Sequence, residues 1–550
     1  MSRRTHILTI VVEDYFHVAA MRGAVARKHW ERLEPRLAQN LADTLTLLDR
    51  HDVRATFFVL GSIAEQQPEL VQRIVDRGHE IASRGFWPRA MRGLSPAEFL
   101  DDLRRSRQAL EAAGANRILG YRAPTWLREE ELWMLDLLVD EGYRYDSSLN
   151  PILRRFAGQP QRLHLHRHGD AQRGLWEFPV ATTSLLGLRV AISGGNYLRQ
   201  LPHSLLKRVV ARQSAASDEP LVFYFMPWEL DKRQPHIQGL STVQRVRHYR
   251  NLEKTRWVLE DYFRHYRFVG IADYLGLPLE RPAAPPRRAK REVEAATGGE
   301  PVSLVIPLFN EQQNIDYLQR TLLDFRRRLA GTYRFHLILV DDGSTDDTWT
   351  LLEQRFAAVP DCELVRLPEN RGVAAAILTG IRRAPTEIVC SIDCDCSYDP
   401  ADLAQMIPLL QAPGGADLVT ASPYHPDGQV LHVPRWRLFL SKTLSRLYSV
   451  VLSQRLHTFT SCCRVYRKSA LQDLEVRSGG FLGVAELLIA LQLAGGRVVE
   501  YPATLERRLL GESKMKVART IYSHLGLLRR LVWRRLRGGR RPAPPTRPTP

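Results

Sequence analysis

The stretch HLILVDDGSTDDT, residues His336–Thr348, decides the fold of the second half of the chain. Its apolar start predicts a buried strand, and the acidic and small residues that follow predict a turn at the end of that strand. Two further strands end in the same way, because EIVCSI is followed by Asp393-Cys394-Asp395 and SLVIP by Leu308-Phe309-Asn310-Glu311. Three strands would therefore bring acidic or polar side chains to one rim of a sheet.

Strands alternate with helical stretches throughout this half, which predicts an open, doubly wound sheet of parallel strands. The predicted strands are Val302–Pro307, His336–Val340, Glu363–Arg366, Ile388–Ile392 and Leu418–Ala421. Ligands bind such sheets outside the carboxyl ends of the strands. The acidic rim is therefore where we expect a site.

Asp393 and Asp395 are two carboxylates separated by one residue, just past a predicted strand. Such a pair can bind one hard divalent cation, Mg²⁺ or Mn²⁺, through its oxygen atoms. The cation would bridge the diphosphate of a nucleotide sugar and neutralise charge that develops on the leaving nucleotide diphosphate. An isolated pair of this kind is more often a solvated loop, but its place in the repeated strand-end pattern favours a metal site.

Five segments of this half resemble inverting glycosyltransferase family 2, and most of all its dolichyl- or polyprenyl-phosphate sugar synthases. The segments are VIPLFNE, VDDGSTDDT, NRGVAAA, DCDCSYDP and GESKM. The resemblance implies a GT-A (Rossmann-like) domain over residues 301–512, and it assigns roles to individual residues. In that family Pro307, Asn310 and Glu311 line the nucleotide site, Asp341 and Asp342 hold the base and ribose, and Asp393 and Asp395 hold the metal. Arg464 matches an arginine near the phosphates, and Ser513 and Lys514 match a loop that closes over donor and acceptor, so Asp395, Arg464 and Lys514 are the expected catalytic residues.

The segment TFTSCCR, residues 458–464, departs from the family pattern DFTSGFR, because Thr458 stands where the family has Asp. No general base can be named from this segment. A phosphate acceptor is already ionised at neutral pH and needs no base, so the departure slightly favours a lipid phosphate over a sugar hydroxyl. Glu486 matches a family glutamate on a buried helix, where it either packs the helix or takes part in the site.

Residues 513–537 predict a basic amphipathic helix, because apolar residues recur at helical spacing among many arginines and no acidic residue follows Glu512. The apolar residues are Ile521, Leu525, Leu528 and Val532. Such a helix suits an anionic membrane surface, and residues 435–452 repeat the pattern. The alternative is a helix that packs on the domain and exposes a solvated basic face. Residues 538–550 form a Pro/Arg tail that we expect to be disordered.

The first half, residues 1–276, contains enough short strands and amphipathic helices to predict a (β/α) barrel. The predicted strands are Ile7–Val12, Ala55–Leu60, Glu80–Ser83, Gly120–Arg122, Trp176–Val180, Leu221–Phe225 and Phe268–Ile271. Residues 277–300 are rich in Pro, Ala and charge without apolar periodicity, which predicts a linker.

Six segments of the first half resemble the polysaccharide deacetylase (NodB-homology) family, a group of metal-dependent hydrolases on a distorted (β/α) barrel. The segments are VEDYFHV, ATFFVLG, GHEIAS, GYRAP, YDSS and FYFMPWELD. The family uses an Asp base, a metal-binding Asp, two metal-binding His residues and a later His as general acid.

This chain departs from the deacetylase pattern at nearly every working position. The base is Val11, the two histidine ligands are Arg84 and Pro88, and the later histidine is Met226. Asp14 remains, but one carboxylate without imidazoles is a poor transition-metal site, and Arg84 would repel a cation. The sequence therefore predicts a pseudoenzyme domain that could bind a glycan or a partner.

Composition limits the partners and the compartment. The formal net charge of +18 favours phosphate-rich partners, but we expect no nucleic acid because the chain has no recognised nucleic-acid-binding module. The six cysteines form no C-x-x-C pair, which indicates reduced thiols. Neither a signal-peptide core nor an apolar stretch long enough to span a membrane is present. These patterns predict a cytoplasmic protein, peripheral at the inner face of the cytoplasmic membrane.

The sequence as a whole predicts an α/β protein: an inverting hexosyltransferase that moves a sugar from a nucleotide-sugar donor to a polyprenyl phosphate, in polysaccharide or glycolipid synthesis. A degenerate deacetylase domain precedes it. Three alternatives stay open: transfer to a glycan hydroxyl during exopolysaccharide assembly, a non-catalytic glycan-binding assembly protein, and a working deacetylase. The intact acidic motifs argue against the second, and the four substitutions argue against the third.

Overall fold

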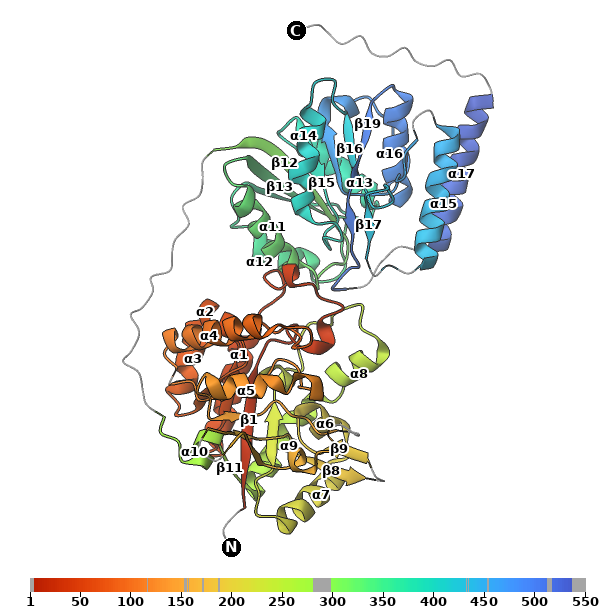
Figure 1. The fold of residues 1–550 in the computed structure, drawn as a ribbon. Helices are drawn as coiled ribbons and strands as arrows, with labels where there is room; N and C mark the ends of the chain where they lie inside the picture. The colour runs from red at the N-terminus through yellow and green to blue at the C-terminus, as the bar shows by residue number, and fades with distance from the viewer. Residues whose placement is uncertain are drawn as a thin grey trace. The chain divides into compact units, whose positions relative to one another are not determined.

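A computed structural model describes residues 4–115, 117–152, 156, 158–170, 173–185, 188–279, 298–431, 433, 435–452, 455–511 and 517–536 (Figure 1). The chain divides into two compact units. The first comprises Met1–Arg27, Pro35–Gln234 and Leu240–Lys290, and the second comprises Lys28–Glu34, Pro235–Gly239 and Arg291–Pro550. Most of the predicted linker, residues 277–300, lies outside the described residues.

A curled, mainly parallel sheet forms the first unit. Its strands, in spatial order, are β10 (Val222–Phe225), β1 (Thr5–Val12), β2 (Thr56–Val59), β3 (Glu80–Ser83), β4 (Gly120–Tyr121), β5 (Tyr145–Asp146), β7 (Leu175–Glu177) and β6 (His166–His168), and β11 (Arg267–Val269) also pairs with β1. The pairing of β6 with β7 is antiparallel, and the other pairings are parallel. The sheet path ends at β10 and β6 in the described residues, so it forms a partial barrel of the predicted distorted type.

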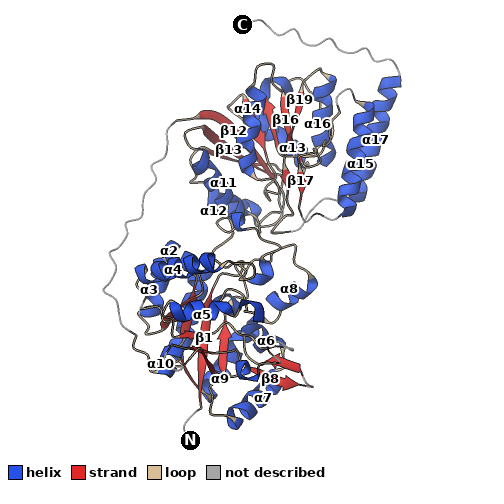
Figure 2. Cartoon of the chain, viewed as in Figure 1, coloured by secondary structure: helices blue, strands red, loops and turns tan. Residues whose placement is uncertain are grey.

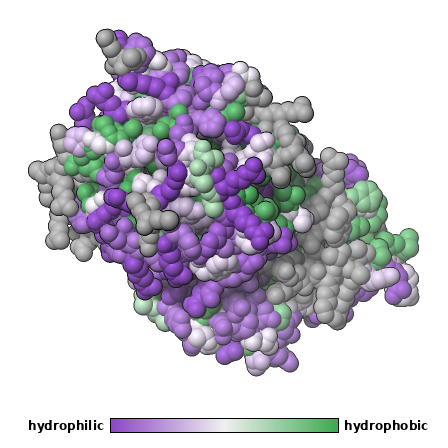
Figure 3. Space-filling model, turned by 90° about the horizontal axis from the view of Figure 1, so that it is seen from below, coloured by the Kyte–Doolittle hydropathy of each residue, from purple (hydrophilic) through white to green (hydrophobic). Residues whose placement is uncertain are grey.

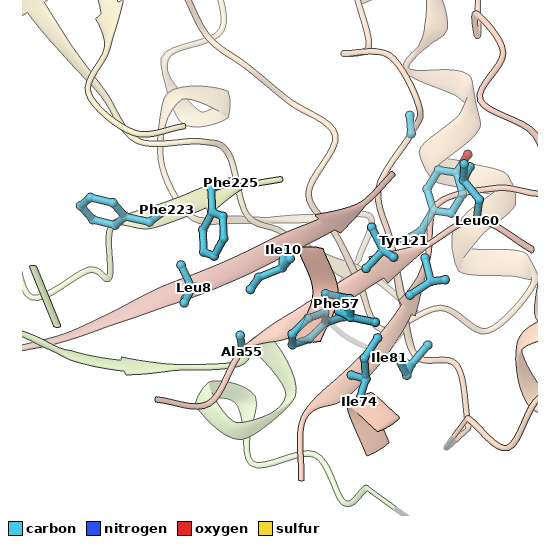
Figure 4. Packing of buried hydrophobic residues seen from close by; sticks show 14 of the residues in the cluster. Leu8, Ile10, Ala55, Phe57, Leu60, Ile74, Ile81, Tyr121, Phe223 and Phe225 are labelled. Atoms are coloured by element: carbon cyan, nitrogen blue, oxygen red, sulfur yellow. The ribbon is translucent and has the colours of Figure 1, made fainter. Parts of the chain in front are cut away.

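Helices cover this sheet and complete its core (Figure 2). They are α1 (Leu37–Arg50), α2 (Gly61–Gln66), α3 (Pro68–Val75), α4 (Pro96–Ala112), α5 (Trp133–Asp140), α6 (Gly195–Gln200), α7 (His203–Ala216), α8 (Thr242–Tyr249), α9 (Leu252–His265) and α10 (Ile271–Leu275), with a hairpin of β8 (Thr182–Leu185) and β9 (Leu188–Ala191). Neighbouring strands contribute Leu8, Ile10, Phe57, Ile81 and Phe225 to one apolar cluster (Figure 4).

The second unit contains a seven-stranded mixed sheet. Its order is β14 (Cys362–Arg366), β13 (Tyr333–Asp341), β12 (Glu300–Leu308), β15 (Ile388–Ser391), β18 (Arg464–Arg467), β16 (Leu418–Ser422) and β19 (Val498–Pro502). The expectation of an all-parallel sheet is wrong at β18, which runs antiparallel to β15 and β16. The side chains of a strand do not encode its direction. That direction depends on the connection, which here runs through a helix outside the sheet.

The helices of the second unit are α11 (Ile315–Leu329), α12 (Thr348–Phe356), α13 (Val373–Arg383), α14 (Leu403–Gln411), α15 (Arg435–Val451), α16 (Phe481–Leu493) and α17 (Val517–Leu536), and a small sheet pairs β17 (Gln429–Val430) with β20 (Thr504–Leu505). Helix α16 is rich in apolar residues, and most of them are buried in the core of this unit. Helices α15 and α17 lie side by side (Figure 1). Among the described helices, none is both long and apolar enough to span a bilayer. Among the coloured residues of the molecule in Figure 3, hydrophilic ones predominate.

Candidate active site

The carboxyl ends of three neighbouring strands bring the predicted acidic residues to one rim of the second sheet. Asp341 ends β13 beside Leu308 of β12, and β15 pairs with the other side of β12 and leads into Asp393. The strand-end positions expected from the sequence therefore share one rim.

Asn310 joins the loop after β12 to the loop after β13. Its backbone is left-handed, with φ of 53°, a conformation that Asn tolerates better than most residues. The Asn310 Oδ1 atom accepts hydrogen bonds from the backbone N–H groups of Thr345 at 2.8 Å and Asp346 at 3.3 Å, and the Asn310 N–H donates to Ser344 Oγ at 2.9 Å. Pro307 is buried in β12 close by. Asn310 thus fixes the shape of the acidic turn.

The two aspartates of that turn are buried and bonded to protein groups. Asp341 Oδ1 accepts from the Ser344 N–H at 3.2 Å, while its Oδ2 lies 3.4 Å from the Nε atom of Arg366. Asp342 accepts from the N–H groups of Arg371 at 2.8 Å and Gly372 at 2.7 Å, and burial raises its pKa. These contacts hold the NRG turn against the rim, and a role for the two aspartates at the base and ribose stays a prediction.

Asp393 and Asp395 follow β15 and are both partly exposed. Asp395 Oδ1 accepts from the N–H group of Ser397 at 2.9 Å and from its hydroxyl at 2.6 Å. Burial and the neighbouring charge of Asp395 raise the pKa of Asp393 to about 7. Two carboxylates held this close repel each other, which favours uptake of a proton or a cation.

Arg508 supplies a positive charge beside these carboxylates. Its Nη2 atom donates to Glu311 Oε2, which also accepts from Asn314 Nδ2 at 2.6 Å, and its Nε atom lies 3.4 Å from Asp395 Oδ2. Burial lowers the pKa of Arg508, but Asp395 and Glu311 outweigh burial and raise it. Sequence reasoning missed Arg508. Its position three residues before Gly511, the first residue of GESKM, was the available signal.

The oxygen atoms at this rim fit a hard divalent cation that phosphate oxygens would also ligate. Within the described part of the chain, no group of three or more His, Cys, Asp or Glu side chains is arranged to hold a metal ion. The neighbouring thiols of Cys394 and Cys462 have pKa values that burial raises, so they are protonated and are poor ligands. Binding of Mg²⁺ or Mn²⁺ by Asp393 and Asp395 stays a prediction.

Arg464 is fully buried, and its Nη atoms donate to the backbone carbonyls of Val484 at 2.7 Å and Phe459 at 2.8 Å. It joins β18 to α16 and to the preceding loop, and its contact with phosphates stays a prediction. Glu486 accepts from the Ser478 N–H at 2.9 Å, as expected for a carboxylate that packs the helix. Ser513 and Lys514 lie outside the described residues.

The first unit places Arg84 at the position expected for a histidine ligand and pairs it with an acid. Arg84 Nε donates to Glu13 Oε1 at 2.6 Å, and Nη1 donates to the Ala123 carbonyl at 3.1 Å. Both side chains are buried. The guanidinium thus provides a fixed positive charge beside Glu13.

Asp14 caps the N-terminus of α1. Its Oδ2 atom accepts from the N–H groups of Arg36 at 2.9 Å and Leu37 at 3.1 Å, which satisfies donors that a helix N-terminus leaves free. Burial raises its pKa to about 6. Met226 Sδ accepts from Trp228 Nε1 at 3.1 Å. In the described residues these groups are engaged with the protein itself.

Framework residues of the first unit form a buried network. Arg122 donates to Thr9 Oγ1 at 2.9 Å and to the Ser147 hydroxyl at 2.6 Å and carbonyl at 2.8 Å. Asp146 accepts from the Ser148 N–H at 2.8 Å and hydroxyl at 2.7 Å. The network joins β1, β4 and β5 and is structural.

Comparisons with known proteins agree with this division. Residues 303–475 match the family model for glycosyl transferase family 2, residues 34–145 the model for polysaccharide deacetylase, and residues 147–276 a domain of unknown function, DUF3473. The polyprenol monophosphomannose synthase of Mycolicibacterium smegmatis is 32% identical over 220 residues, which are 38% of this chain and 80% of that protein. The dodecaprenyl-phosphate galacturonate synthase of Rhizobium johnstonii is 29% identical over 235 residues, 41% of this chain and 65% of that protein.

Among solved structures, the glucosyl-3-phosphoglycerate synthase of Mycobacterium tuberculosis, in complex with Mn²⁺, uridine diphosphate and glucosyl-3-phosphoglycerate, is 19% identical. It covers 43% of this chain and 80% of that chain with a TM-score of 0.32. The family model over residues 303–475 and the synthase that is 32% identical place the second unit, and with it this chain, in glycosyltransferase family 2, while residues 34–145 of the first unit match the polysaccharide deacetylase model.

Proposed function

We propose that the second unit transfers a sugar from a nucleotide-sugar donor to a polyprenyl phosphate, with Mg²⁺ or Mn²⁺ bound by Asp393 and Asp395. The observation that carries the proposal is the juxtaposition of these carboxylates with Arg508 at the rim where three strands end. The relatives support the acceptor class, since the names of two of them share a polyprenyl phosphate and differ in the sugar. The donor sugar is therefore left open.

The proposed reaction inverts the anomeric carbon in one displacement. An ionised oxygen of the acceptor phosphate attacks that carbon, and the bond from the carbon to the nucleotide diphosphate breaks. When bound, the cation would stabilise the negative charge on the leaving diphosphate. The phosphate nucleophile carries no proton to remove, so the absence of an aspartate at Thr458 is no obstacle.

The chain's own residues would bind and orient the two substrates. Asn310 shapes the acidic turn on which Asp341 and Asp342 would meet the base and ribose. Arg508 would hold the charge of the diphosphate close to Glu311 and Asp395. Ser513 and Lys514, a few residues further along the chain, would close over the bound substrates.

We also propose that α15 and α17 bind the inner face of the cytoplasmic membrane, where a polyprenyl phosphate resides. Apolar side chains on both helices are exposed: Phe439 at 70% and Val450 at 75% on α15, and Tyr522 at 76% and Trp533 at 58% on α17. Exposed basic residues on the same helices are Lys442, Arg446, Arg529 and Arg530. An apolar surface with cationic neighbours suits anionic lipid headgroups.

For the first unit we propose the loss of deacetylase activity. Metal-bound water needs an ion held by several ligands, and the expected positions hold Arg84 and Pro88. The Arg84–Glu13 pair supports the proposal, because it fixes beside Glu13 a guanidinium that would repel a cation.

A donor screen tests the glycosyltransferase proposal. Full-length protein is incubated with a panel of nucleotide sugars, undecaprenyl phosphate and Mg²⁺ or Mn²⁺, and the lipid fraction is analysed by mass spectrometry. We expect one donor to yield a sugar phosphate lipid, and chelator to stop the reaction. Transfer to glycan oligosaccharides with none to the lipid would reject the proposed acceptor, and no transfer from any donor would reject the function.

A further inference from the structure

The second unit includes a short segment, Lys28–Glu34, from the first half of the chain. His29 is buried, with its Nε2 atom 2.7 Å from Glu506 Oε2 and its Nδ1 atom 3.1 Å from the hydroxyl of Tyr317 on α11. Lys28 Nζ lies 2.5 Å from Glu506 Oε1, and Arg32 Nη2 donates to Asp399 Oδ1 at 3.0 Å. Three basic side chains of this segment therefore contact two acidic residues of this unit, Glu506 and Asp399.

Those two acidic residues belong to the loops that form the candidate site. Asp399 lies on the loop that begins with Asp393 and Asp395, and Glu506 lies two residues before Arg508. The Glu506 N–H donates to the Ser397 carbonyl at 2.9 Å, so the two loops also bond to each other. Lys28, His29 and Arg32 thus contact the loop carrying the metal-binding carboxylates and the loop carrying the neighbouring arginine.

The basic side chains of this cluster stabilise the ionised forms of its two acids. Burial acts to raise the pKa of Glu506, but hydrogen bonds and charges from His29 and Lys28 outweigh it and lower the pKa to about 2. Burial also acts to raise the pKa of Asp399. The charge of Arg32 and hydrogen bonds outweigh burial, so the pKa of Asp399 is lowered. Burial raises the pKa of a third acid, Asp402, and Asp399 and Glu506 both help to raise it, while Lys28 acts to lower it. Without the basic side chains these partly buried acids would lack compensating charge, which disfavours the observed approach of the loops.

We propose that Lys28–Glu34 is an integral part of the glycosyltransferase unit and that His29 and Arg32 are positioning residues for Asp395 and Arg508. They act through Asp399 and Glu506 and do not touch the substrates. The consequence for catalysis rests on the proposed function of the site, whereas the consequence for loop order does not. A family 2 domain expressed from residue 301 onward would lack these contacts.

Hydrogen exchange of the full chain, read by mass spectrometry, tests the positioning directly. Arg32→Ala and His29→Ala should speed exchange of peptides covering residues 395–402 and 504–510 by at least about threefold, because local opening becomes easier. Arg27→Ala is the matched control, since Arg27 has a neighbouring position and the same charge but lies over the Trp87 ring of the first unit. Arg32→Lys, and the exchanged pair Arg32→Asp with Asp399→Arg, should restore slower exchange. Equal exchange in Arg32→Ala, His29→Ala and Arg27→Ala would overturn the proposal.

Kinetics provide the second measurement. In Arg32→Ala the Mn²⁺ concentration for half-maximal transfer should rise about fivefold or more with an unchanged unfolding temperature, because Asp395 is held less well. An unchanged Mn²⁺ requirement together with faster loop exchange would overturn the link to Asp395. If the wild-type protein transfers no sugar while the exchange results hold, the proposed function fails and the positioning of the loops stands.

Discussion

The Nε atom of Arg508 lies 3.4 Å from Oδ2 of Asp395, one of the two carboxylates expected to bind the metal. The guanidinium therefore provides positive charge at the rim before any cation arrives. A cation that binds Asp393 and Asp395 must compete with this charge, and the competition can be measured without substrate.

Arg508→Ala should tighten binding of Mn²⁺ alone, because it removes a competing cation. We expect the dissociation constant at pH 8 to fall about three- to tenfold, as for the loss of one like charge close to a partly exposed site. Titration of the full chain with Mn²⁺, followed by electron paramagnetic resonance of free Mn²⁺, gives the constant. Arg507→Ala, the adjacent arginine, is the control. Weaker Mn²⁺ binding in Arg508→Ala would contradict this interpretation of the pair.

Asp393→Ala and Asp395→Ala should each abolish sugar transfer without unfolding the protein. Each removes a carboxylate that would hold the cation, and losses of single electrostatic groups in active sites cost about 10²–10³-fold in kcat. Both residues are partly exposed and lie in a loop, so the unfolding temperature should barely change. Asp427→Ala, at an acid whose side chain is 80% exposed, controls for a lost surface charge. Near wild-type transfer that still requires metal would show that other residues bind it.

The strand-end acids were predictable because alternating strands and helices fix where strands end, and Asp341, Asp342, Asp393 and Asp395 follow apolar runs directly. All seven strands predicted in the first half overlap observed strands, whereas β5, β6, β8 and β9 were not predicted. Arg508 was not predicted as a site residue, because it reaches the rim from a loop far along the chain. The contacts of His29 with Glu506 and of Arg32 with Asp399 were not predicted for the same reason. Local sequence patterns contain no information about partners more than 300 residues away.

Vesicle binding should depend on the exposed apolar residues of α15. The double variant Phe439→Asp, Val450→Asp should bind phosphatidylglycerol vesicles at least about tenfold more weakly, because each change replaces apolar contact with charge repulsion. Sedimentation with vesicles measures this. Val243→Asp on α8, where Val243 is 67% exposed, is the matched control. Salt should weaken binding of the wild type by screening. Equal sedimentation of the variants would exclude α15 as the contact surface.

The buried Glu80 should make the first unit less stable as pH rises from about 4.5 to 7. Burial raises its pKa to about 7, although Thr56 and Tyr145 hydroxyls and the Ala272 N–H donate to it. Between these two pH values the folded state still binds a proton that the unfolded state has released. The stability that this proton provides is fully present below the unfolded pKa, and about 3 kcal/mol of the free energy of unfolding is lost as pH rises through the folded pKa.

Glu80→Gln removes this titration. Calorimetry of the full chain should show that the unfolding midpoint of the first unit falls more steeply with pH in the wild type than in Glu80→Gln. A difference in unfolding midpoint that is the same at every pH does not test the prediction, because the amide of Gln changes the hydrogen bonds at every pH. Parallel pH profiles would mean that Glu80 is ionised throughout this range.

Arg84 and Glu13 should depend on each other for stability and should leave the first unit without deacetylase chemistry. Arg84→Ala leaves Glu13 buried without its partner and should lower the free energy of unfolding by about 3–5 kcal/mol, whereas the double change Glu13→Gln, Arg84→Met should recover most of it. The control is Arg104→Ala, which breaks a pair with Glu141 at 2.6 Å in which Arg104 is 66% exposed. That change should cost much less stability than Arg84→Ala, because water and salt screen an exposed pair. Wild-type protein dialysed against Zn²⁺, Co²⁺ or Ni²⁺ should retain no stoichiometric metal bound to this unit and release no acetate from acetylated chitooligosaccharides. Tightly bound metal with acetate release above the no-enzyme rate would contradict the proposed loss of deacetylase activity. An Arg84→Ala protein as stable as Arg104→Ala would contradict the dependence of Arg84 and Glu13 on each other.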